Sequence, residues 1–178
     1  LRFIVSNTTE AGIEYKPNQN PDDFNGLTFP GRLTLFMKKR FDEGLGGFIL
    51  LPCELIYKNG DNLKECILKY SVDWGYGGEF EKWIENENHF TNTLVDRIVT
   101  GYPRDDAKEM EQSYGYLDDM IDTAEIFHLW VIEGDKKLAE EIPFHKIGLN
   151  VLWTDDVTPY KKRKVRILNG AHTMTVLA

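Results

Sequence analysis

The strongest constraint on the fold of this chain is a repeated alternation of short apolar runs with amphipathic segments of helical spacing. A short apolar run bounded by turn residues is typical of a strand that is buried on both faces. The segments between these runs place apolar residues at the i, i+3, i+4 and i+7 positions that line one face of a helix. Strands that alternate with helices favour a parallel sheet, so the sequence predicts an α/β, doubly wound fold.

The expected elements follow one another along most of the chain. The apolar runs predict strands at residues 1–5, 47–51, 94–100, 127–132 and 148–153. Helical spacing predicts a helix carrying Leu33 to Phe41, one that is capped by Asp61 or Asn62, one over 80–87, and a mostly polar one over 105–123 that breaks near Gly115. Ser6, Asn7 and Thr8 follow the first strand, and the ends of such strands are where α/β sheets bind ligands.

The composition limits the class of protein. With 178 residues, 42% hydrophobic and 28% charged, the chain can bury the core of one ordinary domain or slightly more. The formal net charge of -8 argues against nucleic acids and anionic membranes as partners. No apolar run approaches the ~20 residues of a membrane span and no signal-peptide pattern opens the chain, so we expect a cytoplasmic protein. Cys53 and Cys66 match neither a disulfide framework nor a zinc pattern, so we expect reduced thiols and no metal.

The character of the chain changes after Asp155, where a basic segment without further strand signals begins. Thr158 is expected to cap a helix whose first residue is Pro159, because the threonine oxygen satisfies a backbone N–H and proline has none. We therefore divide the chain near Asp156 into residues 1–156 and residues 157–178. The chain opens at Leu1, not at a methionine, and we expect it to be part of a longer protein.

The basic helix carries the residues that most favour chemistry. At ~100° per residue, Lys164, Leu168 and His172 are expected on one face, with Asn169 facing the same cleft. An amine, an amide and an imidazole suit carbonyl reduction or alcohol oxidation without a metal, because the lysine exchanges a proton with the substrate oxygen that the other two hold. The competing interpretation is a solvated basic helix face with Asn169-Gly170 as its end.

Two glycine clusters, residues 44–47 and 75–78, begin like a dinucleotide-binding loop. Neither continues as G-x-G-x-x-G, and the first precedes its strand, so both are expected to be turns. A loop that binds the pyrophosphate of a dinucleotide must then lie upstream of Leu1, and we expect the 178-residue chain alone to be inactive.

Lys164, Asn169 and His172 form the pattern K-x4-N-G-x-H, which resembles the catalytic signature of the mannitol dehydrogenase family of polyol-specific long-chain dehydrogenases and reductases. Further blocks that resemble the family, in the family's order, are residues 6–12, 29–31, 52–56 with Asn59-Gly60, 95–103, 130–134 and 154–160. These blocks extend over nearly the whole chain, and it is their combination that makes the resemblance specific.

The resemblance implies an NAD-dependent enzyme whose active site lies between a Rossmann-type domain and a mainly helical C-terminal domain. Residues 1–156 would be the later part of the first domain, and residues 157–178 would be the first helix of the second. Lys164 would be the general acid in reduction, while Asn169 and His172 would orient and polarise the carbonyl.

The resemblance also implies roles for residues of the first domain. Ser6, Asn7 and Thr8 would lie near the nicotinamide, and the competing interpretation is that they only cap the turn. Asp96 would support the substrate, and the competing interpretation is an ion pair with Arg97 or another base.

One position departs from the polyol-oxidising members of the family. They read Ser-Cys-Asp-Asn where this chain reads Pro-Cys-Glu-Leu, so Leu55 replaces an asparagine that helps to polarise the substrate oxygen. The mechanism must then use fewer donors or recruit a neighbour such as Asn59.

The Pro-Cys-Glu-Leu-Ile block at residues 52–56 resembles the uronate-reducing branch of the family, which implies interconversion of tagaturonate and altronate. A uronate carboxylate needs a cation, and Arg163 and Arg166 are the nearest candidates; the alternative is a cation from residues that follow Ala178. Fructuronate reduction and polyol oxidation are competing activities. The non-enzymatic alternative is an α/β module whose basic helix is an interaction face.

Overall fold

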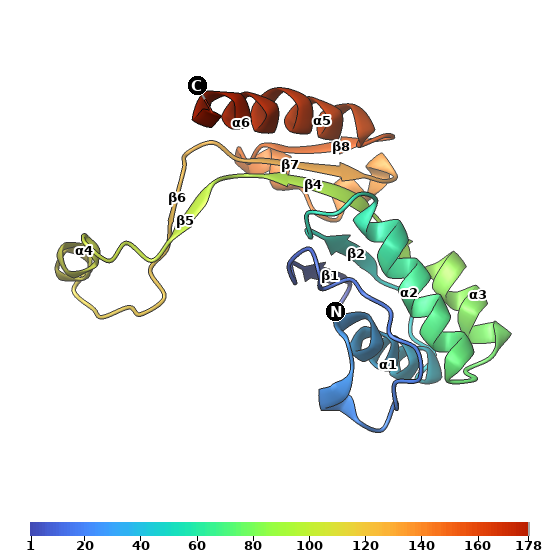
Figure 1. The fold of residues 1–178 in the computed structure, drawn as a ribbon. Helices are drawn as coiled ribbons and strands as arrows, with labels where there is room; N and C mark the ends of the chain where they lie inside the picture. Colours follow the sequence, from blue (N-terminus) through green and yellow to red (C-terminus); the bar gives the residue numbers. More distant parts are fainter. Residues whose placement is uncertain (178) are drawn as a thin grey trace.

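The computed structural model describes residues 1–177, apart from the side chains of residues 172 and 177. It shows an α/β fold with one long terminal helix (residues 158–177) and one projecting arm (residues 97–126) (Figure 1). The strands are β1 (Phe3–Ser6), β2 (Ile49–Pro52), β3 (His89–Phe90), β4 (Asn92–Asp96), β5 (Val99–Gly101), β6 (Thr123–Ala124), β7 (Leu129–Glu133) and β8 (Val151–Thr154). The α-helices are α1 (Phe29–Asp42), α2 (Asn59–Asp73), α3 (Gly78–Glu87), α4 (Ala107–Tyr114), α5 (Thr158–Arg163) and α6 (Gly170–Leu177). A π-helical segment, η4 (Lys164–Asn169), joins α5 to α6, and the 3-10 helices are η1 (Phe24–Gly26), η2 (Lys136–Glu140) and η3 (Phe144–Ile147).

The described strands form a parallel three-stranded sheet, a mixed three-stranded sheet and a two-stranded ribbon. Strands β1, β2 and β3 pair in that order and run parallel, as the alternating pattern predicts. Thr91 alone separates β3 from β4, and its backbone N–H and its hydroxyl both donate to the carbonyl of Leu50. Strand β7 then pairs antiparallel with β4 and parallel with β8. The predicted parallel sheet is therefore confirmed for its first half, while β7 reverses direction.

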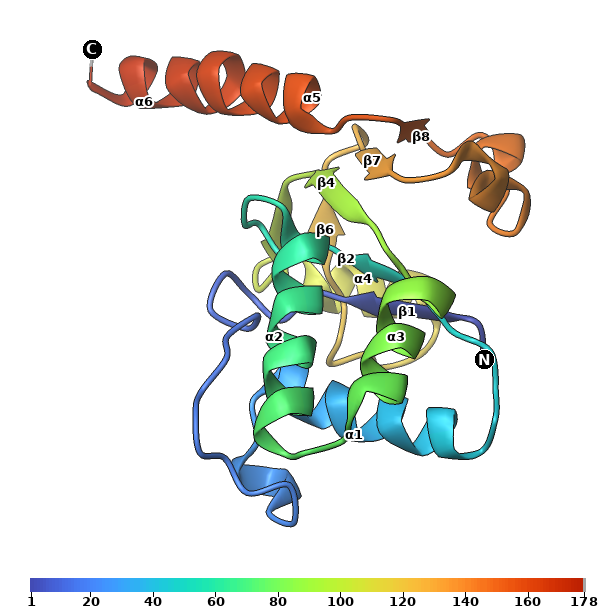
Figure 2. The same ribbon diagram turned by 90° about the vertical axis from the view of Figure 1, so that its right-hand side faces the viewer.

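Two apolar layers lie on the two faces of β2, whose four residues are all buried, and a third apolar cluster joins β4 and β7 to Val157 before the terminal helix. Helices α1, α2 and α3 cover one face (Figure 2), and their apolar residues pack with Phe48 and Leu50. Ile49 and Leu51 point to the other face, where they pack with residues of β7, β8 and the segment around η2. A strand that is apolar on both faces must lie inside a sheet covered on both sides, so β2 fixes the layer order.

The arm replaces most of the polar helix predicted for residues 105–123. Only α4 is helical, because Gly115 adopts a left-handed conformation with φ of 79° and ends the helix. The chain then returns as β6, which pairs antiparallel with β5. Of the residues in α4 only Ala107 is buried, so tertiary packing does not stabilise a continuation of the helix beyond Gly115. The arm projects away from the body in Figure 1.

Other element boundaries agree with the sequence or shift by a few residues. The two glycine clusters are turns, with positive φ angles at Gly44, Gly75 and Gly77. Helix α2 begins at Asn59, before either predicted cap, and its observed N-cap, Lys58, makes no side-chain hydrogen bond. Within the described residues, no helix is long and apolar enough to cross a membrane.

Asn59 ties the loop after β2 to β4. Its buried side-chain amide donates to the carbonyls of Pro52 (2.8 Å), Glu54 (3.1 Å) and Thr93 (3.1 Å). Its oxygen accepts from the N–H groups of Gly60 (3.0 Å) and Thr93 (2.8 Å). One side chain therefore satisfies backbone groups of two strands and a helix start.

We predict that Asn59→Ala lowers the free energy of unfolding by about 3 kcal/mol, because several buried backbone groups lose their partners at ~1–3 kcal/mol each. Urea unfolding measures this loss. Asn62→Ala is the matched control: its side chain makes one exposed hydrogen bond to the Tyr57 carbonyl, and its loss should cost under ~1 kcal/mol. Equal losses in both variants would contradict the role of Asn59 as a tie.

Candidate active site

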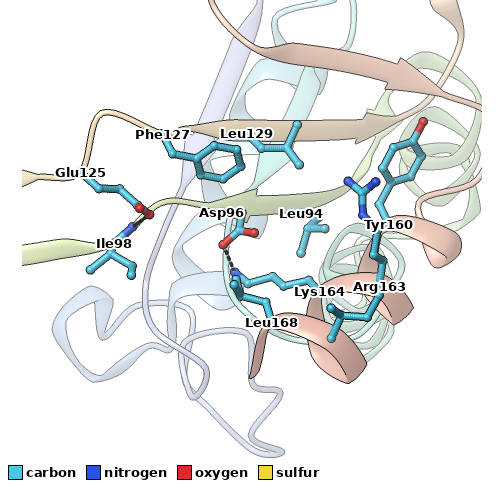
Figure 3. A pocket seen from close by; sticks show the side chains of 11 residues that line it. Leu94, Asp96, Ile98, Glu125, Phe127, Leu129, Tyr160, Arg163, Lys164 and Leu168 are labelled. Carbon is cyan, nitrogen blue, oxygen red and sulfur yellow. Dashed lines mark hydrogen bonds and ion pairs between the residues drawn. The ribbon is translucent and has the colours of Figure 1, made fainter. Parts of the chain in front are cut away.

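A pocket of about 490 Å³ lies where the terminal helix crosses β4 and β7 (Figure 3). Its walls are mostly apolar, and its polar groups come from β4, from the base of the arm and from the terminal helix. The lining residues are Leu94, Asp96, Ile98, Glu125, Phe127, Leu129, Tyr160, Arg163, Lys164, Ile167 and Leu168. An apolar pocket with a few convergent polar groups is the usual form of a small-molecule site.

Lys164 and Asp96 form an ion pair inside this pocket. The lysine Nζ lies 2.9 Å from the Asp96 Oδ1 and also donates to the Val95 carbonyl at 3.0 Å. The two side chains are only 15% and 14% exposed. A solvated basic face, the competing interpretation of the helix, does not describe Lys164. Of the two alternatives for Asp96, an ion pair is present, and its partner is Lys164 and not Arg97, whose Nε donates to the Glu125 carbonyl.

The start of the terminal helix is fixed by two carboxylates. Glu133 at the end of β7 accepts from the Val157 N–H at 2.8 Å and from the Asn92 amide at 2.9 Å. Asp156 accepts from the Thr158 N–H at 2.8 Å, and hydrogen bonds from the hydroxyl and the N–H of Thr158 hold the pKa of Asp156 below its ordinary value. Thr158 is thus the first helical residue and not the predicted cap. A carboxylate before it satisfies the helix N-terminus instead.

The helix changes character at Lys164. Residues 164–169 are π-helical, with i→i+5 hydrogen bonds that change the angular phase of the residues that follow. Lys164 and Leu168 both line the pocket, as predicted, together with Ile167. Asn169 is exposed and does not line the pocket, so the structure does not bring its side chain together with Lys164. His172 belongs to α6, and its side chain lies outside the described residues.

The two candidate arginines occupy different places. Arg163 lines the pocket with Lys164, and its guanidinium carbon lies 6.0 Å from the centroid of the Tyr160 ring. Arg166 lines a separate hollow of about 340 Å³, together with Tyr57, Thr158, Lys161, Lys162 and Val165. Only Arg163 is therefore positioned to act on the same bound molecule as Lys164.

The turn after β1 is organised by Glu54, a carboxylate that is 1% exposed. Its oxygens accept from the Ser6 hydroxyl (3.1 Å), the Thr8 N–H (3.1 Å) and the Thr8 hydroxyl (2.9 Å). These hydroxyls therefore serve the turn, as the competing interpretation for this segment holds, while the Asn7 side chain is exposed. Sequence reasoning missed Glu54 as an organising group; the available signal was a carboxylate directly after a fully apolar strand.

Two further expectations are decided by burial. Leu55, which the family resemblance aligns with an asparagine of the polyol-oxidising members, is 53% exposed. Asn59 was one candidate to replace that asparagine, but all its hydrogen-bonding capacity is used by backbone groups, so it is not a donor for a substrate. Sequence reasoning also missed Glu125 and Tyr160 as pocket residues. Glu125 follows the segment that was predicted to be helical, which hid its place in the pocket wall.

The cysteines and acidic residues offer no second reactive centre in the described part of the chain. No group of three or more His, Cys, Asp and Glu side chains there is placed to hold a metal ion. Burial raises the pKa of the Cys53 thiol to about 11, and burial also raises the pKa of Cys66. Both are free thiols, and the raised pKa values keep them protonated near neutral pH.

Comparisons with known proteins identify the family and the fold of the chain. A profile of the mannitol dehydrogenase Rossmann domain matches residues 5–146. The altronate oxidoreductase of Shigella flexneri is 50% identical over 99% of this chain, and the chain spans 37% of the length of that relative. A substrate-free D-sorbitol dehydrogenase structure superposes with a TM-score of 0.77 at 28% identity, covering 98% of this chain and 38% of the other.

The fold is also that of mannitol 2-dehydrogenase from Pseudomonas fluorescens, solved as a ternary complex with NAD and D-mannitol. It superposes with a TM-score of 0.73 at 23% identity, covering 97% of this chain and 37% of the other. The expected Rossmann-type α/β architecture is thereby confirmed.

We predict that Cys53 is almost unreactive toward iodoacetamide at pH 8, because a thiol with a pKa of about 11 is only ~0.1% thiolate at that pH. Labelling followed by peptide mass spectrometry should be about 100-fold slower than for an ordinary thiol of pKa ~8.5, and should accelerate as the pH rises toward 11. The same chain unfolded in urea is the control. Rapid labelling of folded Cys53 at pH 8 would show that the thiol is activated.

Proposed function

The chain belongs to the mannitol dehydrogenase family, and from this premise we propose that the whole protein is an NAD-dependent oxidoreductase that interconverts tagaturonate and altronate. The observation that carries the proposal is the Lys164–Asp96 pair inside a largely apolar pocket. The chain spans 37% of the length of its altronate oxidoreductase relatives, and we propose that residues beyond these 178 complete the active site.

Lys164 is proposed as the general acid of the reduction. An ammonium group has three hydrogens, and Asp96 and the Val95 carbonyl accept two of them, which leaves one for the pocket. That proton would be transferred to the substrate carbonyl oxygen as negative charge develops on the oxygen. In the oxidation, the proton would return from the alcohol to the lysine. Asp96 supports this role by holding the ammonium at one place. A positioned general acid typically raises the rate of the chemical step by on the order of 10²–10⁴-fold.

Asn169 and His172 are proposed to complete the set that holds the substrate oxygen. The support is their place in the K-x4-N-G-x-H pattern that begins at Lys164. Asn169 ends the π-helical segment that Lys164 begins, and His172 lies in α6, the helix that continues from it. With Leu55 in place of an asparagine, Lys164 would contribute a larger share of the polarisation of the substrate oxygen.

The turn after β1 is proposed to hold the nicotinamide end of NAD. It lies at the carboxyl end of a parallel strand, the edge where Rossmann-type sheets bind dinucleotides. The exposed amide of Asn7 suits the carboxamide of a nicotinamide, whereas Ser6 and Thr8 shape the turn through Glu54. When bound, the cofactor would supply or accept the hydride at the carbonyl carbon. The residues that bind its pyrophosphate are proposed to lie outside these 178.

The substrate is proposed to be a sugar acid. Arg163 places a guanidinium beside Lys164 in the same pocket, and a guanidinium pairs with both oxygens of a carboxylate. Leu55 supports the same conclusion, because it removes the polar group of the polyol-oxidising relatives. The names of the relatives at 49–50% identity point to the same substrate class.

We predict that Lys164→Ala in the full-length enzyme lowers the chemical step by ~100-fold or more and leaves NADH binding nearly intact. Single-turnover kinetics and NADH fluorescence titration measure the two effects. Lys162→Ala is the matched control, because Lys162 lies on the same helix but lines the separate hollow. Wild-type turnover by the Lys164 variant would remove this residue from the mechanism.

A second prediction concerns substrate preference. We expect kcat/KM for tagaturonate to exceed that for fructuronate and fructose, and Arg163→Ala to lower the uronate values by about tenfold or more while changing the fructose value little. Arg166→Ala, which removes an arginine from outside the pocket, should change none of them by more than about twofold. The sugar-acid assignment is wrong if fructose is reduced as efficiently as either uronate.

A further inference from the structure

Glu125 is a pocket residue that is held in place by the chain opposite it at the base of the arm. Its N–H donates to the Ile98 carbonyl at 3.0 Å, and its Oε1 accepts from the Ile98 N–H at 2.6 Å. The Arg97 Nε donates to the Glu125 carbonyl at 3.0 Å. Both its backbone and one carboxylate oxygen are therefore fixed, so the side chain is presented to the pocket at a defined position.

The charged groups of the pocket are arranged along its length. In Figure 3 the Glu125 carboxylate lies at one end, the Arg163 guanidinium lies at the other beside Tyr160, and the Lys164–Asp96 pair lies between them. The walls beside them are apolar and include Leu94. A molecule that lies along this pocket would meet an anion, the proposed proton donor and a cation in that order.

The second oxygen of Glu125 is available to a bound molecule. Among the described residues, Oε1 receives the Ile98 N–H and no hydrogen bond reaches Oε2. An ionised carboxylate has about four acceptor positions and no donor, so it binds hydroxyl groups and repels other carboxylates. The end of the pocket at Glu125 thus suits a hydroxyl and opposes an acid group, which is the reverse of the end at Arg163.

We propose that Glu125 is a specificity-determining residue that binds the hydroxymethyl group next to the reacting ketone and directs the substrate carboxylate toward Arg163. The inference rests on the proposed function, because it takes a keto sugar acid as the substrate. A ketone flanked by a hydroxymethyl group on one side and a chain ending in a carboxylate on the other matches the order of charges in the pocket. In this orientation the ketone oxygen lies at Lys164, and the opposite orientation places two carboxylates against each other.

The test compares two substrates with full-length enzymes. The substrates are tagaturonate and its analogue in which a methyl group replaces the hydroxymethyl group beside the ketone. The enzymes are the wild type, Glu125→Ala and Glu125→Gln; glutamine keeps the acceptor for the Ile98 N–H and guards against misfolding of the alanine variant. Glu109→Gln, an acidic residue of α4 outside this pocket, is the control.

We expect Glu125→Ala to lower kcat/KM for tagaturonate by about tenfold or more, mainly through KM, and to change the value for the analogue by less than about twofold. Glu125→Gln should lie between the wild type and the alanine variant, because a neutral amide binds a hydroxyl less strongly than a carboxylate. Equal losses for both substrates, or no loss for either, would overturn the inference while the proposed function stands. Absence of tagaturonate reduction by the wild type would overturn both.

Discussion

The contact on which the site depends is the attachment of the terminal helix to β4 through Lys164. Its ammonium group is held by the Asp96 carboxylate and the Val95 carbonyl, so one side chain joins two consecutive residues of the strand. Both charges are largely removed from water, and removing one partner of such a pair leaves the other uncompensated at a cost of ~3–5 kcal/mol. The pair is therefore a structural attachment as well as the proposed proton donor. Glu133 fixes the start of the same helix, because its carboxylate accepts hydrogen bonds from the Asn92 amide in β4 and from the Val157 N–H.

The central layers of the fold could be predicted from the sequence because they depend on local apolar patterns. The run at 47–51 became β2, and the apolar spacing from Leu33 to Phe41 became α1, because each pattern has only one way to bury its residues. Lys164 and Leu168 both line the pocket, in agreement with the common helix face that their spacing predicts. Both lie with Asn169 in the π-helical segment, which has no local apolar signature in the sequence, and Asn169 does not line the pocket. The roles of the residues in chemistry came from the family resemblance and remain proposals.

The polar contacts that organise the site could not be predicted, because each joins residues far apart in the sequence. Glu54 receives its donors from the turn after β1, 46 and 48 positions away, and Lys164 reaches Val95 across 69 positions. Asn59 was considered as a substrate donor because nothing in its neighbourhood shows that Thr93 packs against it. A polar residue near a strand end can serve the backbone or a ligand. Only the tertiary partners decide which.

The reversal of β7 is what brings the pocket together. In the observed antiparallel register, Asp96 at the end of β4 pairs with Leu129 at the start of β7. The chain entering β7, with Glu125 and Phe127, therefore lies beside the proposed proton donor. A parallel β7 would require a crossover connection and would begin beside Asn92, at the far end of β4. The arm supplies a return that makes the antiparallel pairing possible, so the segment that departs most from the sequence prediction is also the one that builds a wall of the candidate active site.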